Sequence, residues 1–416
     1  MNKTYDVIVV GAGASGMMAA VQAAENGNRV LLLERNKSLG KKVLLTGNGR
    51  CNLTNTAELG GFIEQIPDSG KFLYNVFSQF FSDDLIGFLN KFGLKTKVEN
   101  NGRVFPVTDN AGDVVDVFKA SLKKNNVTIK FSRHVSGLII ADGCAQGVKT
   151  DSGEIFSAPS VIIAVGGMSY PETGSTGDGY VLAKQAQHKI IPPYPGLVGL
   201  DIKESFVKEV QGISLDKVQI TLVVKGKKKV SKFGEMIFTH FGVSGPMILD
   251  ISTYILKDDC PELVIDFMPG FSREELSAYI DAAIKISPIQ FCRNCFKELL
   301  PKKFIYALTD YLGIAESRKL NQLTKKEKTC LISSLKALQL TVRRTRPLKY
   351  AMVTRGGVCV KEIDPKTMES KKVKGLYFCG EVLDIAGLTG GYNLQAAFST
   401  GYAAGNAQLR REYNGK

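Results

Sequence analysis

Three glycines near the amino terminus have the spacing of a phosphate-binding turn. Residues 11–16 read G-x-G-x-x-G, follow an apolar run at 5–10 and open a helical pattern at 17–26. The first glycine permits the tight turn, the second lets the backbone approach a pyrophosphate, and the third allows close helix–strand packing. The free N–H groups at such a helix start attract phosphate oxygens. The turn consists of Gly11, Ala12, Gly13, Ala14, Ser15 and Gly16.

An acidic residue completes this first unit. Glu34 ends the second predicted strand, at 29–33, and lies 18 residues after Gly16. A carboxylate in this position accepts hydrogen bonds from ribose hydroxyls and disfavours a 2′-phosphate. The unit therefore predicts a site for an adenine dinucleotide, without deciding between FAD and NAD.

A second glycine–acid pair, close to the carboxyl terminus, favours FAD. A predicted strand at 376–379 runs into Gly380 and Glu381, Asp384 follows, and residues 390–393 read Gly-Gly-Tyr-Asn before the last helical pattern. A ribityl chain needs a row of hydrogen-bonding groups. The N1–C2=O edge of a flavin becomes anionic on reduction, and a helix N-terminus stabilises such a charge. An NAD dehydrogenase has no need to bring its carboxyl terminus back to the cofactor.

A third motif, TGNGRCN at 46–52, is rich in small and amide-bearing residues. Such residues are poor helix and strand formers and make a good backbone cradle. We expect Arg50 to meet a phosphate, and Asn48 and Asn52 to hold the loop in place.

These motifs resemble the bacterial BaiN-like flavoprotein family, which also contains the aminoacetone oxidases. GRVFP at 102–106, VGGMSYPETGSTGDGY at 165–180, GEMIFTHFGVSGP at 234–246 and CGEVLDIAGLTGGYNLQ at 379–395 extend the resemblance over nearly the whole chain. The TGNGRCN and GGYN segments are its most specific parts. One departure is Gln187, where the family usually has glycine, and it concerns a turn outside the site.

The resemblance implies an α/β fold with a three-layer, GR2-like Rossmann-type FAD-binding domain. It also implies an inserted antiparallel β domain and a small inserted helical domain. Short alternating segments after residue 192 are typical of such a β domain, and Ser272 with Glu275 forms a capping box that opens a helical region. We place the FAD domain at 1–192 and 341–416, the β domain at 193–269 with 325–340, and the helical domain at 270–324.

The family's FAD contacts can be carried onto matching positions of this chain. Val135 is expected to touch the adenine through its backbone. The full set comprises residues 11–16, Glu34, Arg35, Thr46, Gly47, Asn48, Gly49, Arg50, Cys51, Asn52, Val135, Gly166, Gly167, Gly380, Glu381, Asp384, Gly391, Tyr392, Asn393 and Leu394.

The reaction is less determined than the cofactor. A second G-x-G-x-x-G is missing, since the glycines at 174–179 have the wrong spacing, so NAD(P)H would bind only transiently as an electron donor. Our leading hypothesis is a reductase that passes hydride through flavin N5 to a small unsaturated or carbonyl compound. An FAD-dependent amine oxidase that uses oxygen and a non-catalytic flavin-loaded binding or sensing protein are the alternatives. Tyr170, His240 and Tyr392 are weak catalytic candidates, for each of which a packing role is favoured.

The net charge and the length of the apolar runs indicate whether nucleic acids or membranes are partners of this protein. The formal net charge is +14, but the lysines form small scattered groups without interleaved aromatic residues. Nucleic-acid platforms combine both features, so we expect no specific nucleic-acid partner. No apolar run approaches the roughly 18 residues of a membrane helix, and we expect a cytoplasmic protein without a membrane partner. The oligomeric state is left open.

The eight cysteines are scattered, and only Cys292 and Cys295 form a Cys-x-x-Cys pair. Zinc would need two further ligands at suitable spacing, and neither a second such pair nor a nearby histidine is present. We therefore expect no metal site and reduced cysteines that pack as small apolar residues, not a dithiol that passes electrons to the flavin.

The paired cofactor motifs lead to a direct prediction. The purified protein should be yellow and should release intact FAD when it is denatured, as checked by chromatography of the supernatant. Release of FMN, or of NAD in place of a flavin, would contradict the assignment.

Overall fold

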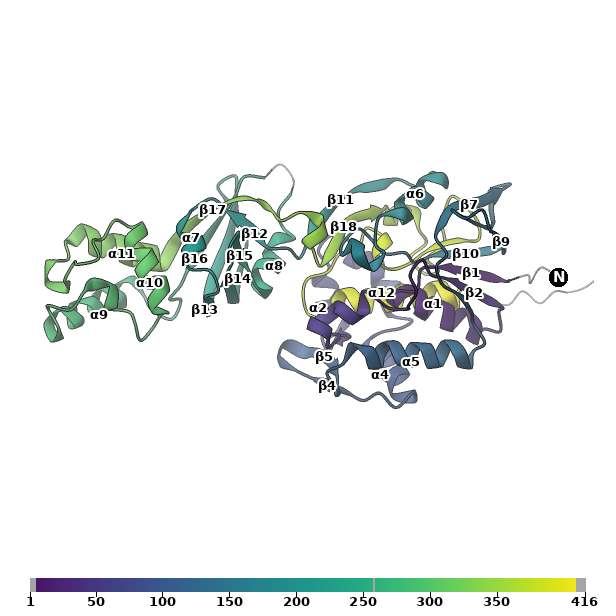
Figure 1. Cartoon of the computed structure of the whole chain (residues 1–416), viewed down its shortest axis with the longest axis horizontal. Helices are drawn as coiled ribbons and strands as arrows, with labels where there is room; N and C mark the ends of the chain where they lie inside the picture. The colour runs from purple at the N-terminus through teal and green to yellow at the C-terminus, as the bar shows by residue number, and fades with distance from the viewer. Residues whose placement is uncertain (1–4, 257–258, 409–416) are drawn as a thin grey trace, which may run out of the picture. The chain divides into compact units, whose positions relative to one another are not determined.

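The computed structural model describes residues 5–256 and 259–408, in two units (Figure 1). The first contains residues up to Pro195 and from Leu348 onwards, and the second contains Gly196–Pro347. The boundaries expected at 192 and 341 fall close to these breaks.

A five-stranded parallel sheet forms the centre of the first unit, in the order β19-β10-β1-β2-β6. Val10, the last residue of β1, pairs with Ile163 on one side and Leu33 on the other. The strand ends that lead into Gly11, Ala164 and Glu34 therefore share one sheet edge. Ligands of such sheets bind at this carboxyl edge, where the strand order reverses. The strands are β1 (Val7–Val10), β2 (Val30–Leu33), β6 (Thr128–Lys130), β10 (Ser160–Ile163) and β19 (Leu376–Phe378).

Two helices from opposite ends of the chain pack together beside this sheet. Figure 1 shows α1 (Ala14–Glu25), in purple, next to α12 (Tyr392–Asn406), in yellow. A Cβ atom at Gly401 would collide with the carbonyl oxygen of Ser15, and one at Gly405 would lie 2.5 Å from the carbonyl oxygen of Ala19. The helices can approach this closely only because both positions are glycine.

Smaller elements complete the first unit. Antiparallel strands β7 (Val135–Ala141), β8 (Cys144–Thr150) and β9 (Ile155–Ser157) form a second sheet that contacts β10, and α5 (Ala111–Lys124) contacts α1. The remaining elements include α2 (Leu59–Glu64), α6 (Asp178–Gln185), β11 (Ile190–Gly196), β18 (Val353–Val358), and the three-stranded sheet of β3 (Thr54–Asn55), β4 (Thr96–Val98) and β5 (Arg103–Pro106).

The segment 71–92, whose residue pattern predicts helix, does not form one continuous helix. It divides into a 3₁₀ turn (Gly70–Leu73), α3 (Tyr74–Phe77) and α4 (Ser82–Lys91). The backbone N–H of Phe81 donates to the Asp84 carboxylate at 2.8 Å, which caps the start of α4. This local cap ends the preceding segment, an effect that apolar periodicity does not reveal.

The second unit is built around a closed antiparallel barrel, as expected for the inserted β domain. On its longest strands, side chains alternate between core and surface, with Val218, Ile220 and Leu222 buried. In barrel order the strands are β12 (Leu200–Ile202), β15 (Gly242–Ser244), β14 (Lys227–Phe238), β13 (Ser214–Val224), β16 (Pro261–Asp266) and β17 (Leu338–Thr345), with α7 (Phe206–Glu209) and α8 (Pro246–Ser252) beside them.

Three further helices follow the barrel strand β16: α9 (Arg273–Ile286), α10 (Lys302–Tyr311) and α11 (Lys325–Ala337). The capping box that opens α9 is present, because the Ser272 hydroxyl accepts from the Glu275 N–H at 3.1 Å. The segment 325–340, which we assigned to the β domain, is mainly helix α11. Strand β17 begins only at Leu338.

All eight cysteines lie in the described part of the chain and are unpaired. Cys292 and Cys295 belong to the apolar core of the second unit. Burial raises the pKa of Cys292 to about 11 and that of Cys295 to about 12. Because the thiolate is the reactive form, neither thiol is poised for redox exchange.

The close contact between α1 and α12 predicts that adding one methyl group at position 401 lowers the stability of the protein. Gly401→Ala should lower the free energy of unfolding by about 1–3 kcal/mol, since the new Cβ overpacks the contact with Ser15. Gly87→Ala in α4 is the matched control, because a Cβ there meets nothing within 4 Å and alanine favours helix by about 0.5–1 kcal/mol. Urea unfolding of both variants makes the comparison. Equal stability of the two would show that α1 and α12 do not pack this closely.

Candidate active site

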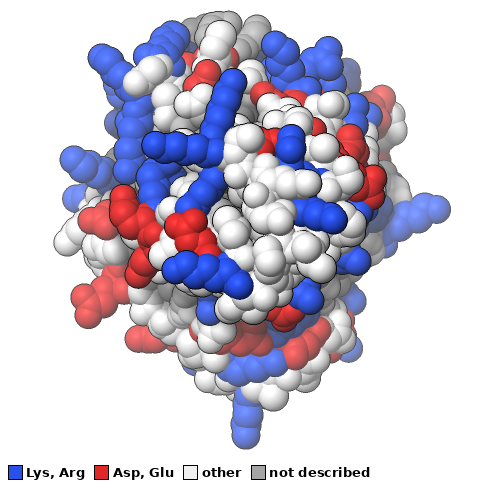
Figure 2. Space-filling model, turned by 90° about the vertical axis from the view of Figure 1, so that its left-hand side faces the viewer, with Lys and Arg blue, Asp and Glu red and all other residues white. Residues whose placement is uncertain are grey.

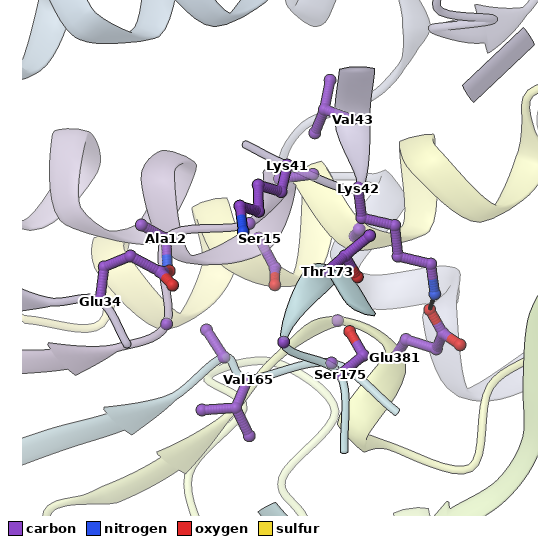
Figure 3. Close-up of a pocket in the computed structure, with 18 of the residues that line it drawn as sticks. Ala12, Ser15, Glu34, Lys41, Lys42, Val43, Val165, Thr173, Ser175 and Glu381 are labelled. Carbon is purple, nitrogen blue, oxygen red and sulfur yellow. Dashed lines mark hydrogen bonds and ion pairs between the residues drawn. The ribbon is translucent and has the colours of Figure 1, made fainter. Parts of the chain in front are cut away.

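A cavity lies at the carboxyl edge of the parallel sheet in the first unit (Figure 3). Its empty volume, open mouth included, is about 1310 Å³. The residues that line it come from the ends of β1, β2, β10 and β19 and from the first turn of α12.

The glycine turn forms one wall of the cavity, and its glycines have different tasks. Gly11 has φ +96°, and a Cβ there would lie 2.7 Å from the carbonyl oxygen of Ala164. A Cβ at Gly16 would collide with the carbonyl oxygen of Gly11. A Cβ at Gly13, in contrast, meets no protein atom within 4 Å, although Gly13 lines the cavity. Gly11 and Gly16 therefore serve the fold, whereas the second glycine of the motif leaves space for a ligand.

The start of α1 has the features of an anion-binding site. Gly13 is the N-cap residue, and no side chain caps the helix. The first N–H groups of a helix have no partner within the helix and carry positive potential. A pyrophosphate beside Gly13 would accept hydrogen bonds from these N–H groups, and its negative charge would be stabilised by the positive potential.

Glu34 has a structural task at the glycine turn. It is only 6% exposed, and its carboxylate accepts from the Ala12 N–H at 2.8 Å and from the Asn36 N–H at 2.7 Å. These bonds tie the end of β2 to the glycine turn. An ionised carboxylate has about four acceptor positions, so capacity for a ribose hydroxyl remains.

Polar side chains close the cavity near Glu34. Arg35 donates to Asp178 at 2.6 Å and to Thr176 at 2.7 Å, and His134 Nε2 lies 3.0 Å from the same Asp178 carboxylate. Val135 is buried and lines the cavity. This end therefore fits the adenosine half of a dinucleotide.

The opposite end contains a partly buried ion pair. Figure 3 shows Lys42 and Glu381 joined across the cavity wall, and their Nζ and Oε2 atoms are 2.5 Å apart. Glu381 also accepts from the Ser169 hydroxyl at 2.6 Å and from the Thr354 N–H at 2.7 Å. The motif analysis had singled out Glu381 but neither Lys42 nor its neighbour Lys41.

Arg50 does not face the cavity. Its guanidinium pairs with Glu99 and with Asp109, and it stacks on the Phe105 ring at 4.2 Å. These contacts attach the TGNGRCN loop to strands β4 and β5. Of residues 46–52, only Thr46 lines the cavity, so the expectation that Arg50 meets a phosphate has no support in this geometry.

The asparagines next to this loop hold the carboxyl-terminal glycines. Asn55 donates to the Gly390 carbonyl at 3.0 Å, and the Asn52 amide, oriented to satisfy both its groups, accepts from the Gly391 N–H at 3.1 Å. Gly391 has φ +100°, and a Cβ there would collide with the Thr54 backbone. The Thr54 backbone therefore requires glycine at position 391.

None of the three catalytic candidates lines the cavity. Tyr392 packs edge-on against Phe62, with ring centroids 4.7 Å apart. His240 belongs to the second unit, is exposed and contacts the Phe241 ring. Tyr170 is partly buried, which raises its pKa, and its ring centre lies 5.9 Å from Lys42 Nζ. Tyr392 is thus packed in the core of the first unit, and Tyr170 lies near the site without forming its wall.

The structure thus brings together most of the residues taken from the two terminal motifs. The expected cofactor residues that line the cavity are Gly11, Ala12, Gly13, Ala14, Ser15, Glu34, Arg35, Thr46, Val135, Gly166, Gly380, Glu381, Asn393 and Leu394. Those that do not are Gly16, Gly47, Asn48, Gly49, Arg50, Cys51, Asn52, Gly167, Asp384, Gly391 and Tyr392. The cavity residues that were not among the expected cofactor residues include Lys41, Lys42, His134, Asp178, Met352 and Ile385. Asp178 and Ile385 lie within the segments 165–180 and 379–395 quoted for the family resemblance, whereas the other four lie outside the quoted segments.

Comparison with known proteins identifies the family. The model of the HI0933-like protein Rossmann domain matches residues 5–407. The chain belongs to this family. It is an FAD-dependent oxidoreductase. Of the residues that line the cavity, Glu34 would hold the adenosine half of FAD, and the start of α1 would hold the pyrophosphate.

Two curated relatives match over nearly their whole length. The 3-dehydro-bile acid delta(4,6)-reductase of Clostridium scindens is 33% identical over 412 residues, which cover 97% of this chain and 98% of the relative. The ribosomal RNA dihydrouridine synthase of Escherichia coli is 32% identical over 400 residues, 96% of each chain.

Solved structures share the fold at low sequence identity. A flavocytochrome c3 fumarate reductase has a TM-score of 0.54 at 17% identity, covering 98% of this chain and 78% of the other. The 3-ketosteroid-delta4-(5alpha)-dehydrogenase of Rhodococcus jostii also has a TM-score of 0.54, at 14% identity, covering 99% and 98%. Within residues 5–256 and 259–408, no helix has the length and apolar character needed to cross a membrane.

The open space at Gly13 predicts a separation of folding from binding. Gly13→Ala should leave the apoprotein as stable as the parent but weaken FAD binding by about tenfold or more, because the new Cβ occupies the pyrophosphate approach. Gly60→Ala is the control, since a Cβ there also meets nothing within 4 Å but lies outside the cavity lining. FAD titration and thermal unfolding of both apoproteins test this. Unchanged FAD affinity in the Gly13→Ala variant would show that the FAD phosphates do not bind at this wall of the cavity.

Proposed function

We propose that this protein is an FAD-dependent reductase of a carbon–carbon double bond conjugated to a carbonyl group in a six-membered ring. The proposal rests mainly on what two relatives of similar identity have in common. Their names describe chemically distant substrates, a bile acid and a ribosomal RNA. The bond that is reduced has the same electronic character in both.

The shared chemistry can be read from the names. A 3-dehydro bile acid has a ketone at C3, with which the delta(4,6) double bonds are conjugated. Dihydrouridine is uridine whose 5,6 double bond, conjugated with the C4 carbonyl, has been saturated. In both rings the carbonyl polarises the double bond, so that the distal carbon accepts hydride. Bound FAD would supply that hydride after its own reduction, and the protein would orient the ring.

Apolar residues of the cavity agree with a ring substrate at the flavin half of the site. Met352, Val353 and Ile385 line the cavity, and none of them carries a polar side-chain group other than a thioether. Met352 is 41% exposed, whereas Val353 and Ile385 are buried. The adenosine end, with Arg35, His134 and Asp178, is polar by comparison. An unsaturated ring would find apolar contacts at these three residues.

The electron donor belongs to the proposal too. NAD(P)H is proposed as a transient donor, because a second dinucleotide fingerprint is missing from the sequence. Small molecules are proposed as substrates, without a specific nucleic-acid partner. Figure 2 looks onto the end that carries α9 and α11, where Lys and Arg are interspersed with Asp and Glu.

One aromatic residue of the second unit bears on the nucleic-acid question. Phe233 on β14 is 61% exposed and follows the lysines at 227–229. Its cross-strand partner is Gln219, and the next residue on its face is the exposed Glu235. A carboxylate beside the ring opposes a phosphate backbone. This setting favours a solvated hairpin over a nucleic-acid platform.

The test uses the oxidation of reduced flavin, so that it does not depend on the donor. The FAD-loaded protein is reduced anaerobically with dithionite and mixed with a Δ4-3-ketosteroid, with uridine, or with a uridine-containing ribosomal RNA fragment. We expect the flavin absorbance to recover with at least one conjugated ring, and not with the saturated ketosteroid that serves as control.

Other outcomes would decide against the proposal. Bleaching of the oxidised flavin by aminoacetone, with reoxidation only by oxygen, would indicate an amine oxidase. Inertness to every ring and every amine would leave a flavin-loaded binding protein. Recovery with the RNA fragment but with neither free ring would replace the small-molecule substrate by RNA.

A further inference from the structure

Three large apolar side chains are exposed on one short loop of the second unit. Ile286, the last residue of α9, is 81% exposed, Ile289 is 72% exposed and Phe291 is 41% exposed. All three line one groove on the surface, so they form a contiguous patch. Single exposed apolar residues are common on soluble proteins, whereas several together mark a contact surface. Residues 286–291 are called the apolar loop below.

Backbone hydrogen bonds hold the apolar loop in this conformation. The Pro288 carbonyl accepts from the Asn321 N–H at 3.0 Å, and the Gln290 carbonyl accepts from the Leu320 N–H at 2.9 Å. Side chains that follow the loop face the core of the second unit, at Cys292, Cys295 and Phe296. The three exposed side chains take no part in this core, and the two backbone bonds keep them directed towards solvent.

The charge around the apolar loop is positive. From 282 to 297 the sequence contains three basic residues and no acidic one. Lys285 directly precedes Ile286, and Lys319 lies opposite Phe291 in an isolated β-bridge. Neither ammonium group forms an ion pair with any residue of the ranges 5–256 and 259–408. A negatively charged partner would therefore meet two unpaired cations beside the apolar side chains.

The size of the patch favours a lipid surface over a protein partner. Stable interfaces between folded proteins bury roughly 20–30 residues on each side. The apolar loop has six residues, of which three carry large exposed apolar side chains. A bilayer needs no matching surface, because single side chains enter between the lipids. Segments that bind at membrane surfaces combine apolar side chains with Lys or Arg, which attract anionic headgroups.

We propose that the apolar loop docks the second unit onto an anionic lipid surface. Ile286, Ile289 and Phe291 enter the boundary between headgroups and acyl chains. Lys285 and Lys319 stay at the headgroups, because a lysine stem can lie along apolar groups while its ammonium group remains in water. The expectation of no membrane partner rested on the absence of long apolar runs, and a loop that binds at the surface needs no such run. The inference is independent of the reaction proposed above.

Sedimentation with lipid vesicles measures this contact. The purified holoprotein is mixed with vesicles of phosphatidylcholine, with or without added phosphatidylglycerol. We expect clear binding to the vesicles that contain phosphatidylglycerol and much weaker binding to the neutral ones. Added salt should reduce the binding without abolishing it, because salt screens the lysines and leaves the apolar contacts intact. Equal binding to both kinds of vesicle, or binding to neither, would overturn the proposal.

Substitutions distinguish the apolar loop from the rest of the positively charged surface. Ile289→Ser should weaken binding to the anionic vesicles by about tenfold, because one isoleucine no longer enters the bilayer. Lys285→Gln should weaken it by about fivefold, as expected for one cation at an anionic surface. Ile155→Ser is the matched control and should bind like the parent. Ile155 is 61% exposed as well, but it lies on β9 of the first unit, next to Glu154.

Fluorescence gives a second readout that does not depend on a loss of binding. The chain contains no tryptophan, so a single introduced tryptophan reports on its own position. In Ile289→Trp, the emission should shift to shorter wavelength when anionic vesicles are added, and lipids brominated on the acyl chains should quench it. Ile155→Trp should show neither change. Thermal unfolding of each variant verifies that it is folded.

Three further outcomes would overturn the lipid contact. Equal weakening by Ile289→Ser and Ile155→Ser would assign the binding to the net charge of the protein. An Ile289→Trp emission that does not respond to vesicles would show that the loop stays in water. Self-association in analytical ultracentrifugation that Ile289→Ser abolishes would assign the patch to a second copy of the chain. None of these measurements requires turnover, so failure of the proposed reaction would leave the result intact.

Discussion

The close contact between α1 and α12 is the constraint on which the rest of the site depends. Glycine at 401 and 405 allows the helix backbones to approach, and this places the segment before α12 beside the glycine turn. Gly380 lies so near Ser15 that a Cβ there would collide with the serine hydroxyl. The Gly380 N–H also donates to Thr400 on α12 at 2.9 Å. One contact therefore joins the two ends of the chain into a single binding site.

The TGNGRCN loop extends this arrangement without contributing most of the cavity wall. Arg50 fixes the loop to the β4–β5 hairpin through two carboxylates, and Asn52 and Asn55 fix the Gly390–Gly391 backbone to the loop. A motif that looks like a cofactor cradle is thus largely a brace for the carboxyl-terminal segment.

Charge within the cavity follows the expected asymmetry of a dinucleotide. Helix α1 offers uncapped N–H groups in the middle, Glu34 offers acceptors at one end, and the Lys42–Glu381 pair offers a donor and an acceptor at the other. Because Lys42 and Glu381 neutralise each other, the cost of burying their charges is limited. The apolar contribution of Val353 and Ile385 lies in the same cavity. The lining of the cavity thus contains both polar and apolar groups.

The amino-acid sequence by itself determined the features that depend on near neighbours along the chain. The G-x-G-x-x-G turn, the buried parallel strands, the Ser272–Glu275 cap and the antiparallel character of the inserted unit all follow from local spacing, and the structure has each of them. The choice of FAD over NAD also came from motifs at the two termini.

Tertiary structure alone decided which of these residues face the ligand. Nothing near Arg50 in the sequence reveals Glu99 and Asp109 as its partners, and nothing near Gly391 reveals the Thr54 backbone. Lys42 follows no motif, and it gains its place only because Glu381, more than three hundred residues later, lies opposite it. Hydrogen bonds and close approaches between distant segments depend on how the chain folds back, and local residue patterns do not encode that distance.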